Sequence, residues 1–109
     1  MTETEFLELA EQTLAVIEAA VEAVNEDVDI ETSRNGNVLT LELADRSKVI
    51  VNSQAAMQQL WVAARSGGYH YAPAADGSWR DTRDGSELFA ALSKVVSAQG
   101  GVPVLLRAP

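Results

Sequence analysis

The chain has 109 residues, a length that suits one domain, and 47% of them are hydrophobic, which is enough for one core. Acidic residues outnumber basic ones by 16 to 8, so the net charge is −8, and nucleic-acid binding is disfavoured because phosphate recognition needs a basic surface. The chain contains no cysteine and one histidine, which excludes disulfides, thiolate metal sites, a cysteine nucleophile and a histidine-cluster metal site.

Residues 4–24 are predicted to form an amphipathic helix. Apolar side chains from Phe6 to Val24 recur at three- and four-residue steps, the pattern of a helix with one face on a core. Thr2 and Glu5 have the spacing of a capping box, so we expect the helix to begin just after Thr2.

The charge excess is concentrated on this helix and just after it. Ten of the 16 acidic residues lie within residues 1–31, which contain no lysine or arginine. An ordinary solvated helix face is the alternative, but such faces usually mix signs, and like charges four residues apart repel. We therefore expect a functional negative surface. Its helical part falls within an arc of roughly 80° at 100° per residue. We name it the acidic ridge, and it consists of Glu8, Glu11, Glu18 and Glu22.

An antiparallel meander is predicted next, because the period of the apolar residues changes to two. Residues 28–32 and 38–43 are expected to be strands joined by a hairpin turn at Asn35-Gly36, where both central positions need a positive φ. A further turn leads to a strand over 48–52. The expected inward positions are Val28, Ile30, Thr32, Leu39, Leu41, Leu43, Val49 and Val51.

Residues 53–65 fit two interpretations. Local propensity slightly favours a helix, because alanine, methionine and glutamine are good helix formers. The alternative is a loop followed by a short strand over 59–63, with Leu60 and Val62 inward and Trp61 outward.

A further hairpin and a second helix are predicted for the rest of the chain. Tyr69-His70-Tyr71 and residues 78–82 are expected to be its two strands. Asp84-Gly85-Ser86 supplies a turn and an N-cap for a helix over 87–98, which Gly100-Gly101 ends.

The order of these elements predicts the fold class. Strands grouped between two helices indicate an α+β two-layer sandwich, an antiparallel sheet with two helices packed on one face. The order is α-β-β-β-β-β-β-α, with residues 102–107 as a short C-terminal strand, in one domain over 1–109. The other face of the sheet is expected to be open.

Several short motifs lie along the chain in an order that is typical of one protein family. They are Glu5-Phe6, Asp27-Val28-Asp29-Ile30, Asn35-Gly36, Val38-Leu39-Thr40-Leu41, Ser47-Lys48-Val49-Ile50-Val51-Asn52, Gln54, Gln59-Leu60-Trp61-Val62-Ala63, Gly67-Gly68-Tyr69-His70-Tyr71, Trp79, and Asp84-Gly85-Ser86-Glu87-Leu88. With these motifs the chain resembles the frataxin family, in particular its bacterial CyaY-type members, over about residues 4–107. The resemblance implies a strand over 59–63, and we adopt it because tertiary context often overrides helix propensity.

The resemblance also implies a function. Frataxins are acidic cytoplasmic proteins of iron–sulfur cluster assembly that bind iron weakly through surface carboxylates. They dock on the complex of cysteine desulfurase and scaffold protein, where they present iron or modulate cluster formation. We therefore expect an iron-binding accessory or regulatory protein rather than an enzyme, cytoplasmic and monomeric, with iron-dependent oligomers as an alternative.

Two groups of candidate site residues follow. The candidate iron ligands, which we name the acidic surface, are Glu11, Glu18, Glu22, Glu26, Asp27, Asp29 and Glu31. The candidate partner-binding residues are Glu18, Glu22, Asp29, Asn52, Gln54, Gln59, Trp61 and His70, of which the asparagine and the glutamines rest on the resemblance alone.

The chemistry of these residues sets limits on the role. Carboxylates are hard ligands that suit iron ions, and exposed ones should hold a metal loosely within a largely aqueous shell. A chain without cysteine carries no sulfur and holds no cluster on thiolates, so both belong to partners.

The aromatic residues have alternative interpretations. Trp61 on an open sheet face is expected to be an interface anchor, and the alternative is a partly covered cross-strand aromatic pair. His70 is expected to be a surface residue of a strand that borders Trp61, and Trp79 to be part of the core.

Two other functions are weighed against iron handling. The first is an acidic electrostatic adaptor for a basic protein without a metal role. The second, ranked last, is an enzyme such as a hydrolase or ferroxidase, because acid–base catalysis needs an enclosed carboxyl and these acids are expected to be exposed. No apolar run approaches the ~20 residues of a membrane span, and the acidic start differs from a signal or transit peptide.

Overall fold

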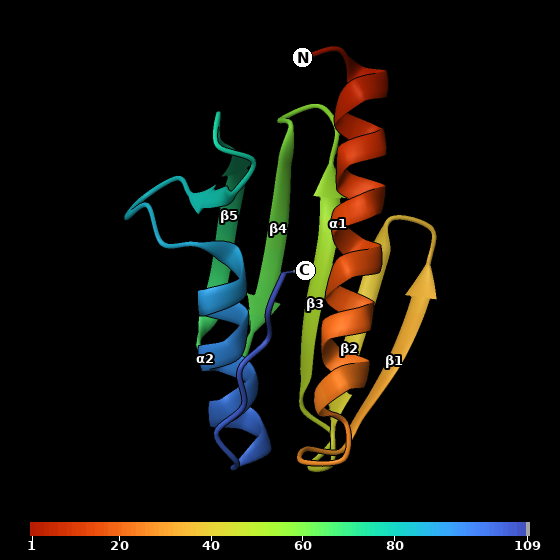
Figure 1. Ribbon diagram of the computed structural model, residues 1–109, viewed down its shortest axis with the longest axis vertical. Helices are drawn as coiled ribbons and strands as arrows, with labels where there is room; N and C mark the ends of the chain where they lie inside the picture. Colours follow the sequence, from red (N-terminus) through yellow and green to blue (C-terminus); the bar gives the residue numbers. More distant parts are fainter. Residues whose placement is uncertain (109) are drawn as a thin grey trace.

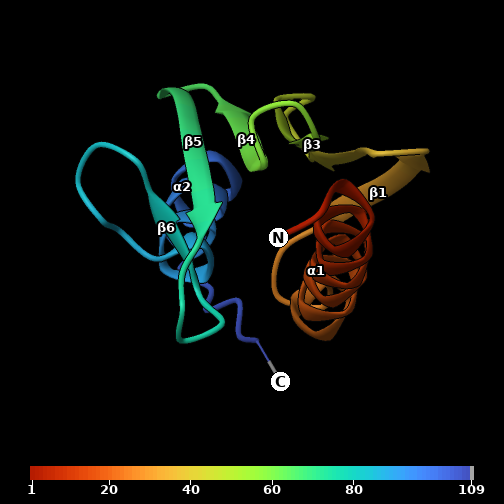
Figure 2. The same ribbon diagram turned by 90° about the horizontal axis from the view of Figure 1, so that it is seen from above.

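The computed structural model describes residues 1–108 and confirms the expected two-layer α+β sandwich. The elements in chain order are α1 (Glu3–Val24), β1 (Ile30–Asn35), β2 (Val38–Leu43), β3 (Lys48–Gln54), β4 (Gln59–Ala64), β5 (Gly67–Pro73), β6 (Trp79–Asp81) and α2 (Leu88–Gly100). The six strands form an antiparallel meander in the order β1-β2-β3-β4-β5-β6. Both helices cover the same face of the sheet, and the other face is open (Figures 1 and 2). Within the described residues, no helix is both long enough and apolar enough to cross a membrane.

Helix α1 begins and packs as its sequence predicts. The hydroxyl of Thr2 accepts a hydrogen bond from the Glu5 amide at 3.1 Å, and the Glu5 carboxylate accepts one from the Thr2 amide at 2.9 Å. These two bonds form the capping box and satisfy amides that the helix itself leaves free.

Trp79 belongs to the core, which confirms its expected role. Its indole is buried, lies edge-on to Phe6 of α1 with the ring centroids 6.0 Å apart, and donates a hydrogen bond to the Thr13 hydroxyl at 3.0 Å. The last strand is thereby tied to the first helix across the sandwich.

The first hairpin departs from the prediction by one residue. Asn35 pairs with Val38, so the two central turn residues are Gly36 and Asn37, and only Gly36 has a positive φ, of 60°. Strand β1 begins at Ile30 rather than at residue 28. The Ile30 amide donates a hydrogen bond to the Asn25 side chain at 2.9 Å.

Thr32 was expected to point into the core but is exposed. It lies on the helix-facing side with Ile30, two residues before it, so the alternation of the strand is as predicted. Strand β1 is the edge of the sheet, with a neighbouring strand on one side only, and Thr32 is exposed there (Figure 1).

The helix favoured for residues 53–65 by local propensity is wrong, and the strand implied by the family resemblance is confirmed. Residues 55–58 form a tight turn in which Gln58 has a φ of 51°, and β4 follows directly. Leu60 and Val62 are buried under the helices, and β4 pairs with a strand on each side. This burial and pairing outweigh a propensity difference of a few tenths of a kcal/mol per residue.

Helix α2 is confirmed, but its N-cap is Glu87 and not the preceding Asp84-Gly85-Ser86 turn. The Glu87 carboxylate accepts hydrogen bonds from the amides of Phe89 at 2.8 Å and Ala90 at 3.1 Å, which satisfies two free amides at the start of the helix. The helix ends before Gly101, whose φ of 72° is the left-handed conformation that favours glycine.

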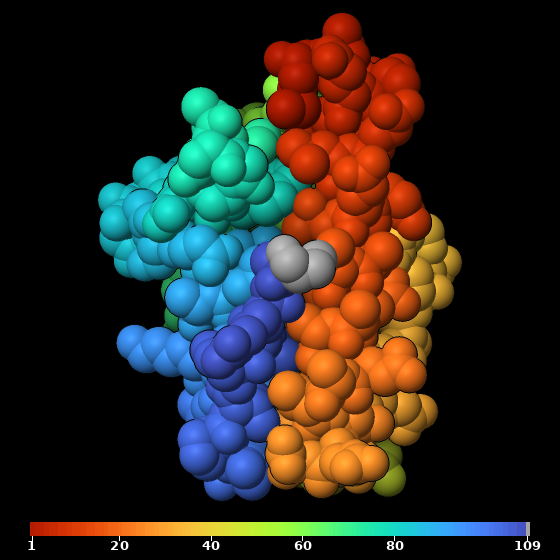
Figure 3. Space-filling model, viewed as in Figure 1, coloured from red at the N-terminus to blue at the C-terminus, as the bar shows by residue number. Residues whose placement is uncertain are grey.

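The C-terminal segment is extended, but residues 102–108 form no strand, which corrects the last predicted element. The segment runs over the helix layer between α1 and α2 (Figure 3). The hydroxyl of Ser97 accepts a hydrogen bond from the Val104 amide at 2.9 Å, and the hydroxyl of Ser93 accepts one from the Leu106 amide at 2.8 Å. Because side chains of α2 satisfy these backbone groups, the segment has no need of a neighbouring strand.

Candidate functional site

The acidic surface extends along α1 and reaches the end of the sandwich where α1 connects to β1. Its members come from the C-terminal two-thirds of α1, from the connection between α1 and β1, and from the start of β1. All of them are exposed except Glu18, whose side chain is about half-buried at 37% exposure. Exposed carboxylates are what the helical period predicted for this face.

The structure does not gather these carboxylates into a preformed chelating group. Within residues 1–108, no three histidine, cysteine, aspartate or glutamate side chains lie close enough together to hold a metal ion. A cation would therefore meet one or two carboxylates at a time and complete its shell with water, which gives weak and exchangeable binding.

A basic residue that the sequence prediction missed sits against the acidic ridge. The Arg34 guanidinium of β1 forms ion pairs with the carboxylates of Glu11 and Glu18 on α1. The alternation of β1 could have revealed it, because Arg34 is four residues after the inward Ile30 and so faces the helices. Residues 1–31 contain no lysine or arginine, but the fold places Arg34 beside two of their carboxylates.

A second missed residue extends the acidic surface onto the open sheet face. Glu31 of β1 lies directly opposite Glu42 of β2, and like charges in that position repel. Together with Asp29 and Arg46 they line a shallow hollow of about 420 Å³. The turn predicted at Asn35-Gly36 would pair residue 31 with Thr40, so only the observed register, with Gly36-Asn37 at the centre of the turn, reveals Glu42.

The remaining candidate residues form one patch on the open face, which we name the tryptophan surface: Asn52, Gln54, Gln59, Trp61 and His70. The Trp61 and His70 rings stack with their centroids 4.3 Å apart and their planes 8° apart, and the Trp61 indole donates to the Gln59 amide oxygen at 2.9 Å. This is the cross-strand aromatic pair that the sequence left as the alternative for Trp61, and His70 borders it as expected. The pairing fixes the orientation of the indole against the imidazole and leaves the indole half-buried.

The two surfaces are close enough for one partner to cover both. Trp61 is three strands away from Glu31 and two side-chain rows along the strand direction. At strand spacings of about 4.8 Å and row spacings of about 6.8 Å, the separation is on the order of 20 Å. A protein interface of ordinary size, roughly 800 Å² per partner, spans that distance.

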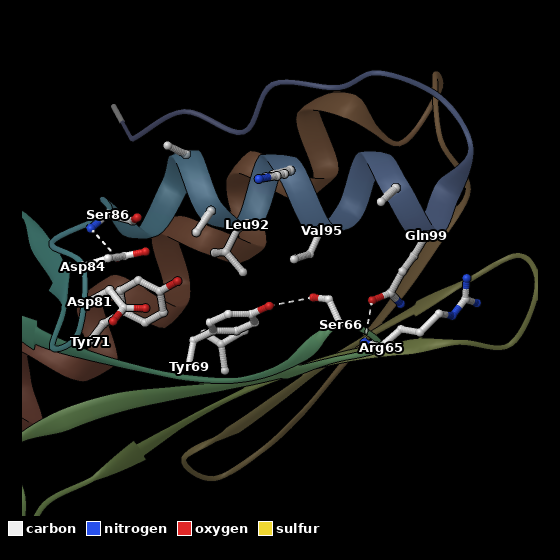
Figure 4. Close-up of a pocket in the computed structure, with 15 residues that line it drawn as sticks. Arg65, Ser66, Tyr69, Tyr71, Asp81, Asp84, Ser86, Leu92, Val95 and Gln99 are labelled. Atoms are coloured by element: carbon white, nitrogen blue, oxygen red, sulfur yellow. Dashed lines mark hydrogen bonds between the residues drawn. The ribbon is translucent and has the colours of Figure 1, made fainter.

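A pocket lies away from both surfaces, between α2 and the helix-facing side of β5 (Figure 4). It has a volume of about 530 Å³, and the Tyr69 hydroxyl shares a hydrogen bond of 2.8 Å with Ser66 along its floor. Burial and then the nearby Asp81 raise the pKa of Tyr71 to about 12, so its hydroxyl stays protonated. Hydrogen bonds from Ser86 lower the pKa of the Asp84 carboxyl, which therefore stays ionised at neutral pH and is not a proton donor.

The amino-acid sequence is similar to a family model and to known proteins along almost its whole length. A family model of the frataxin-like domain matches residues 1–102. The chain is 59% identical over 110 residues to the iron-sulfur cluster assembly protein CyaY of Janthinobacterium sp. (strain Marseille), covering 98% of this chain and 97% of that protein. It is 58% identical to the protein of the same name from Bordetella petrii, covering 98% and 99% of the two chains.

The fold is similar to that of solved frataxin structures. Frataxin from Psychromonas ingrahamii superposes with a TM-score of 0.88 at 34% identity, over 98% of this chain and 99% of that one. Trimeric frataxin from the yeast Saccharomyces cerevisiae, solved in a ferrous complex, superposes with a TM-score of 0.74 at 24% identity over 85% and 86% of the two chains, which shows the fold alone. By its family model, its relatives and its architecture, the chain belongs to the frataxin-like family.

Proposed function

We propose that this protein is an accessory and regulatory component of iron–sulfur cluster assembly. It docks on the complex of cysteine desulfurase and scaffold protein, and there it presents iron or modulates the rate of cluster formation. The observation that carries the proposal is the exposed acidic surface of a chain whose relatives at 58–59% identity are named for this assembly. The protein works in the cytoplasm as a monomer and is not an enzyme.

The acidic surface supports docking on a basic partner. In the part of the chain that the structure describes, Glu22, Glu26, Asp27, Asp29 and Glu31 form no ion pair. Such unpaired charges gain more from an opposite charge on a partner than from any contact inside the molecule, and they steer the encounter. The binding should therefore weaken as salt is raised.

The tryptophan surface supports contact with the same assembly. Trp61 is half-buried, with His70 stacked on one face of its ring, and partly exposed aromatic groups of this kind are common anchors of interfaces. The amide side chains around it offer donors and acceptors without charge. An apolar anchor beside a polar rim is the usual composition of a transient protein interface.

Iron is the cargo in this proposal and not a resident cofactor. Hard carboxylate oxygens suit ferrous and ferric ions, and the open arrangement of the acidic surface favours rapid exchange. A protein that releases iron readily fits the role of donor or sensor. The cluster itself and its sulfur are held by partners, because this chain contains no cysteine.

The docking test is a charge reversal with a matched control. The double variant Glu22→Lys/Asp29→Lys should weaken binding to cysteine desulfurase about tenfold or more at ~0.1 M salt, because two attractions become repulsions. The control Glu3→Lys/Asp76→Lys changes the net charge equally but lies in the first turn of α1 and in the loop between β5 and β6. Equal affinities of the two double variants at low salt would remove the acidic surface as the docking site.

An electrostatic adaptor without a metal role is the second candidate function. The observation that favours it is the lack of a group of three ligating side chains among residues 1–108. A titration with ferrous iron under anaerobic conditions, followed by NMR, separates the two functions. Broadening confined to the amides of residues 18–31 supports iron handling, and its absence supports the adaptor. Rapid, saturable oxidation of ferrous iron by the monomer would contradict both.

A further inference from the structure

The position of Arg34 is unusual for an arginine of an edge strand. It lies on the helix-facing side of β1, opposite Leu39, and its side chain is only 20% exposed. Its Nε donates a hydrogen bond to the Gly36 carbonyl at 2.9 Å, and its two terminal nitrogens contact the carboxylates of Glu11 and Glu18. The guanidinium is therefore held by three acceptors from two different elements.

These contacts place a cation on one part of the acidic ridge. Glu11 and Glu18 are seven residues apart, so they lie about two turns apart on the same side of α1, and one planar guanidinium bridges them. A free metal ion that binds there must displace a partly buried arginine. It would leave the charge of Arg34, whose side chain is only 20% exposed, without a carboxylate partner, which costs free energy.

The other carboxylates of the acidic surface form no ion pair among residues 1–108, although Arg46 lines the same hollow as Asp29 and Glu31. Among residues 1–108, Arg34 is the only base that forms an ion pair with the acidic surface or the acidic ridge, and its partners are Glu11 and Glu18. Its charge also repels any cation that approaches the upper part of α1. The acidic surface is thus divided into a part at Glu11 and Glu18 that one arginine partly neutralises and an open part from Glu22 to Glu31 whose carboxylates form no ion pair.

We propose that Arg34 is a specificity-determining residue that masks Glu11 and Glu18 as a built-in counter-ion and confines hard divalent cations to the open part of the acidic surface. The inference rests on the proposed function in that iron is the cation of interest. The masking itself applies to any hard divalent cation, and that permits a test independent of cluster assembly.

The experiment is a titration with Co²⁺, a redox-stable stand-in for ferrous iron, followed by paramagnetic broadening of backbone amides. In the unchanged protein, broadening should centre on residues 22–31. In Arg34→Gln, a second set of broadened amides should appear at residues 11–18, with at least a three- to tenfold lower Kd there, as expected for removing one unit charge at ~6 Å from a divalent ion in water. Adding Glu11→Gln and Glu18→Gln to Arg34→Gln should abolish the second set.

Two further variants keep the test decisive. Arg80→Gln removes the same charge on β6, where Arg80 lies 4.0 Å from Asp76, and it should leave the pattern of the unchanged protein intact. Arg34→Met keeps the apolar stem of the side chain and loses the charged guanidinium with its hydrogen-bond donors, so it replaces Arg34→Gln if that variant unfolds.

The Co²⁺ titration has outcomes that contradict the masking of Glu11 and Glu18 by Arg34. The inference is overturned if Arg34→Gln gains no second set, or if residues 11–18 bind Co²⁺ equally well in the unchanged protein. If Arg34→Gln gains the second set while residues 22–31 bind no Co²⁺ in any variant, the masking of Glu11 and Glu18 stands, but the confinement of cations to residues 22–31 and the iron-handling part of the proposed function both fail.

Discussion

Replacing Leu106 with alanine tests whether the C-terminal segment is part of the core. The Leu106 side chain is 2% exposed, and its backbone is held by the Ser93 hydroxyl, which accepts the amide at 2.8 Å and lies 3.3 Å from the carbonyl. The preceding Leu105 points the other way and is 55% exposed. These neighbours form a matched pair, because both changes remove the same atoms from the same segment.

The expected cost follows from burial. Truncation of a buried leucine removes its transfer free energy and leaves a cavity, and such changes cost about 2–5 kcal/mol. A segment near a chain end relaxes partly, so we expect about 3 kcal/mol for Leu106→Ala and less than about 0.5 kcal/mol for Leu105→Ala. At ~2.1 cal/mol/K per residue, the 109 residues have an unfolding entropy of about 0.23 kcal/mol/K. The Tm should therefore fall by about 13 °C for Leu106→Ala.

The assay is urea and thermal unfolding followed by circular dichroism. The urea midpoint should fall for Leu106→Ala at an unchanged m-value, because the unfolded chain exposes nearly the same surface. A loss below about 1 kcal/mol for Leu106→Ala, or equal losses for the two variants, would refute the packing of the segment between the helices. Such a result would also mean that truncation before Val102 is tolerated.

Two other predictions concern the end of α2 and the turn between β2 and β3. A Cβ at Gly100 would lie 2.5 Å from the buried Val28 side chain. Gly100→Ala should therefore lower the free energy of unfolding, measured by denaturation, by about 1–2 kcal/mol, although alanine has the better helix propensity. In the double variant with Val28→Ala, this loss from Gly100→Ala should be smaller. Hydrogen bonds from Ser47, with Arg65 nearby, lower the pKa of Asp45 from 3.8 to about 2. The stability that this carboxylate contributes is present above pH 3.8 and is lost as the pH falls through 2. A carbon-detected NMR titration should find the low midpoint, and Ser47→Ala should move it towards 3.8; an unchanged midpoint would contradict the assigned cause.

Much of the candidate site followed from the sequence because it depends on local period and charge. The helical period placed Glu22 on the exposed side of α1, and the alternation of strands placed Trp61 on the open face. The stack of Trp61 on His70 needed the register between β4 and β5, which depends on the turn between them. The ion pairs of Arg34 needed the packing of β1 against α1, and no spacing in the sequence measures that distance.

The sequence by itself determined the kind of molecule: an acidic chain without cysteine, a first helix with one charged side, and a strand meander between two helices. These properties are additive along the chain, since composition, charge and short-range periodicity do not depend on distant contacts. Tertiary structure alone decided the rest. It made a strand of residues 59–64 against their helix propensity, because burying Leu60 and Val62 outweighs it. It also kept residues 102–108 out of the sheet, because polar side chains of α2 satisfy that backbone.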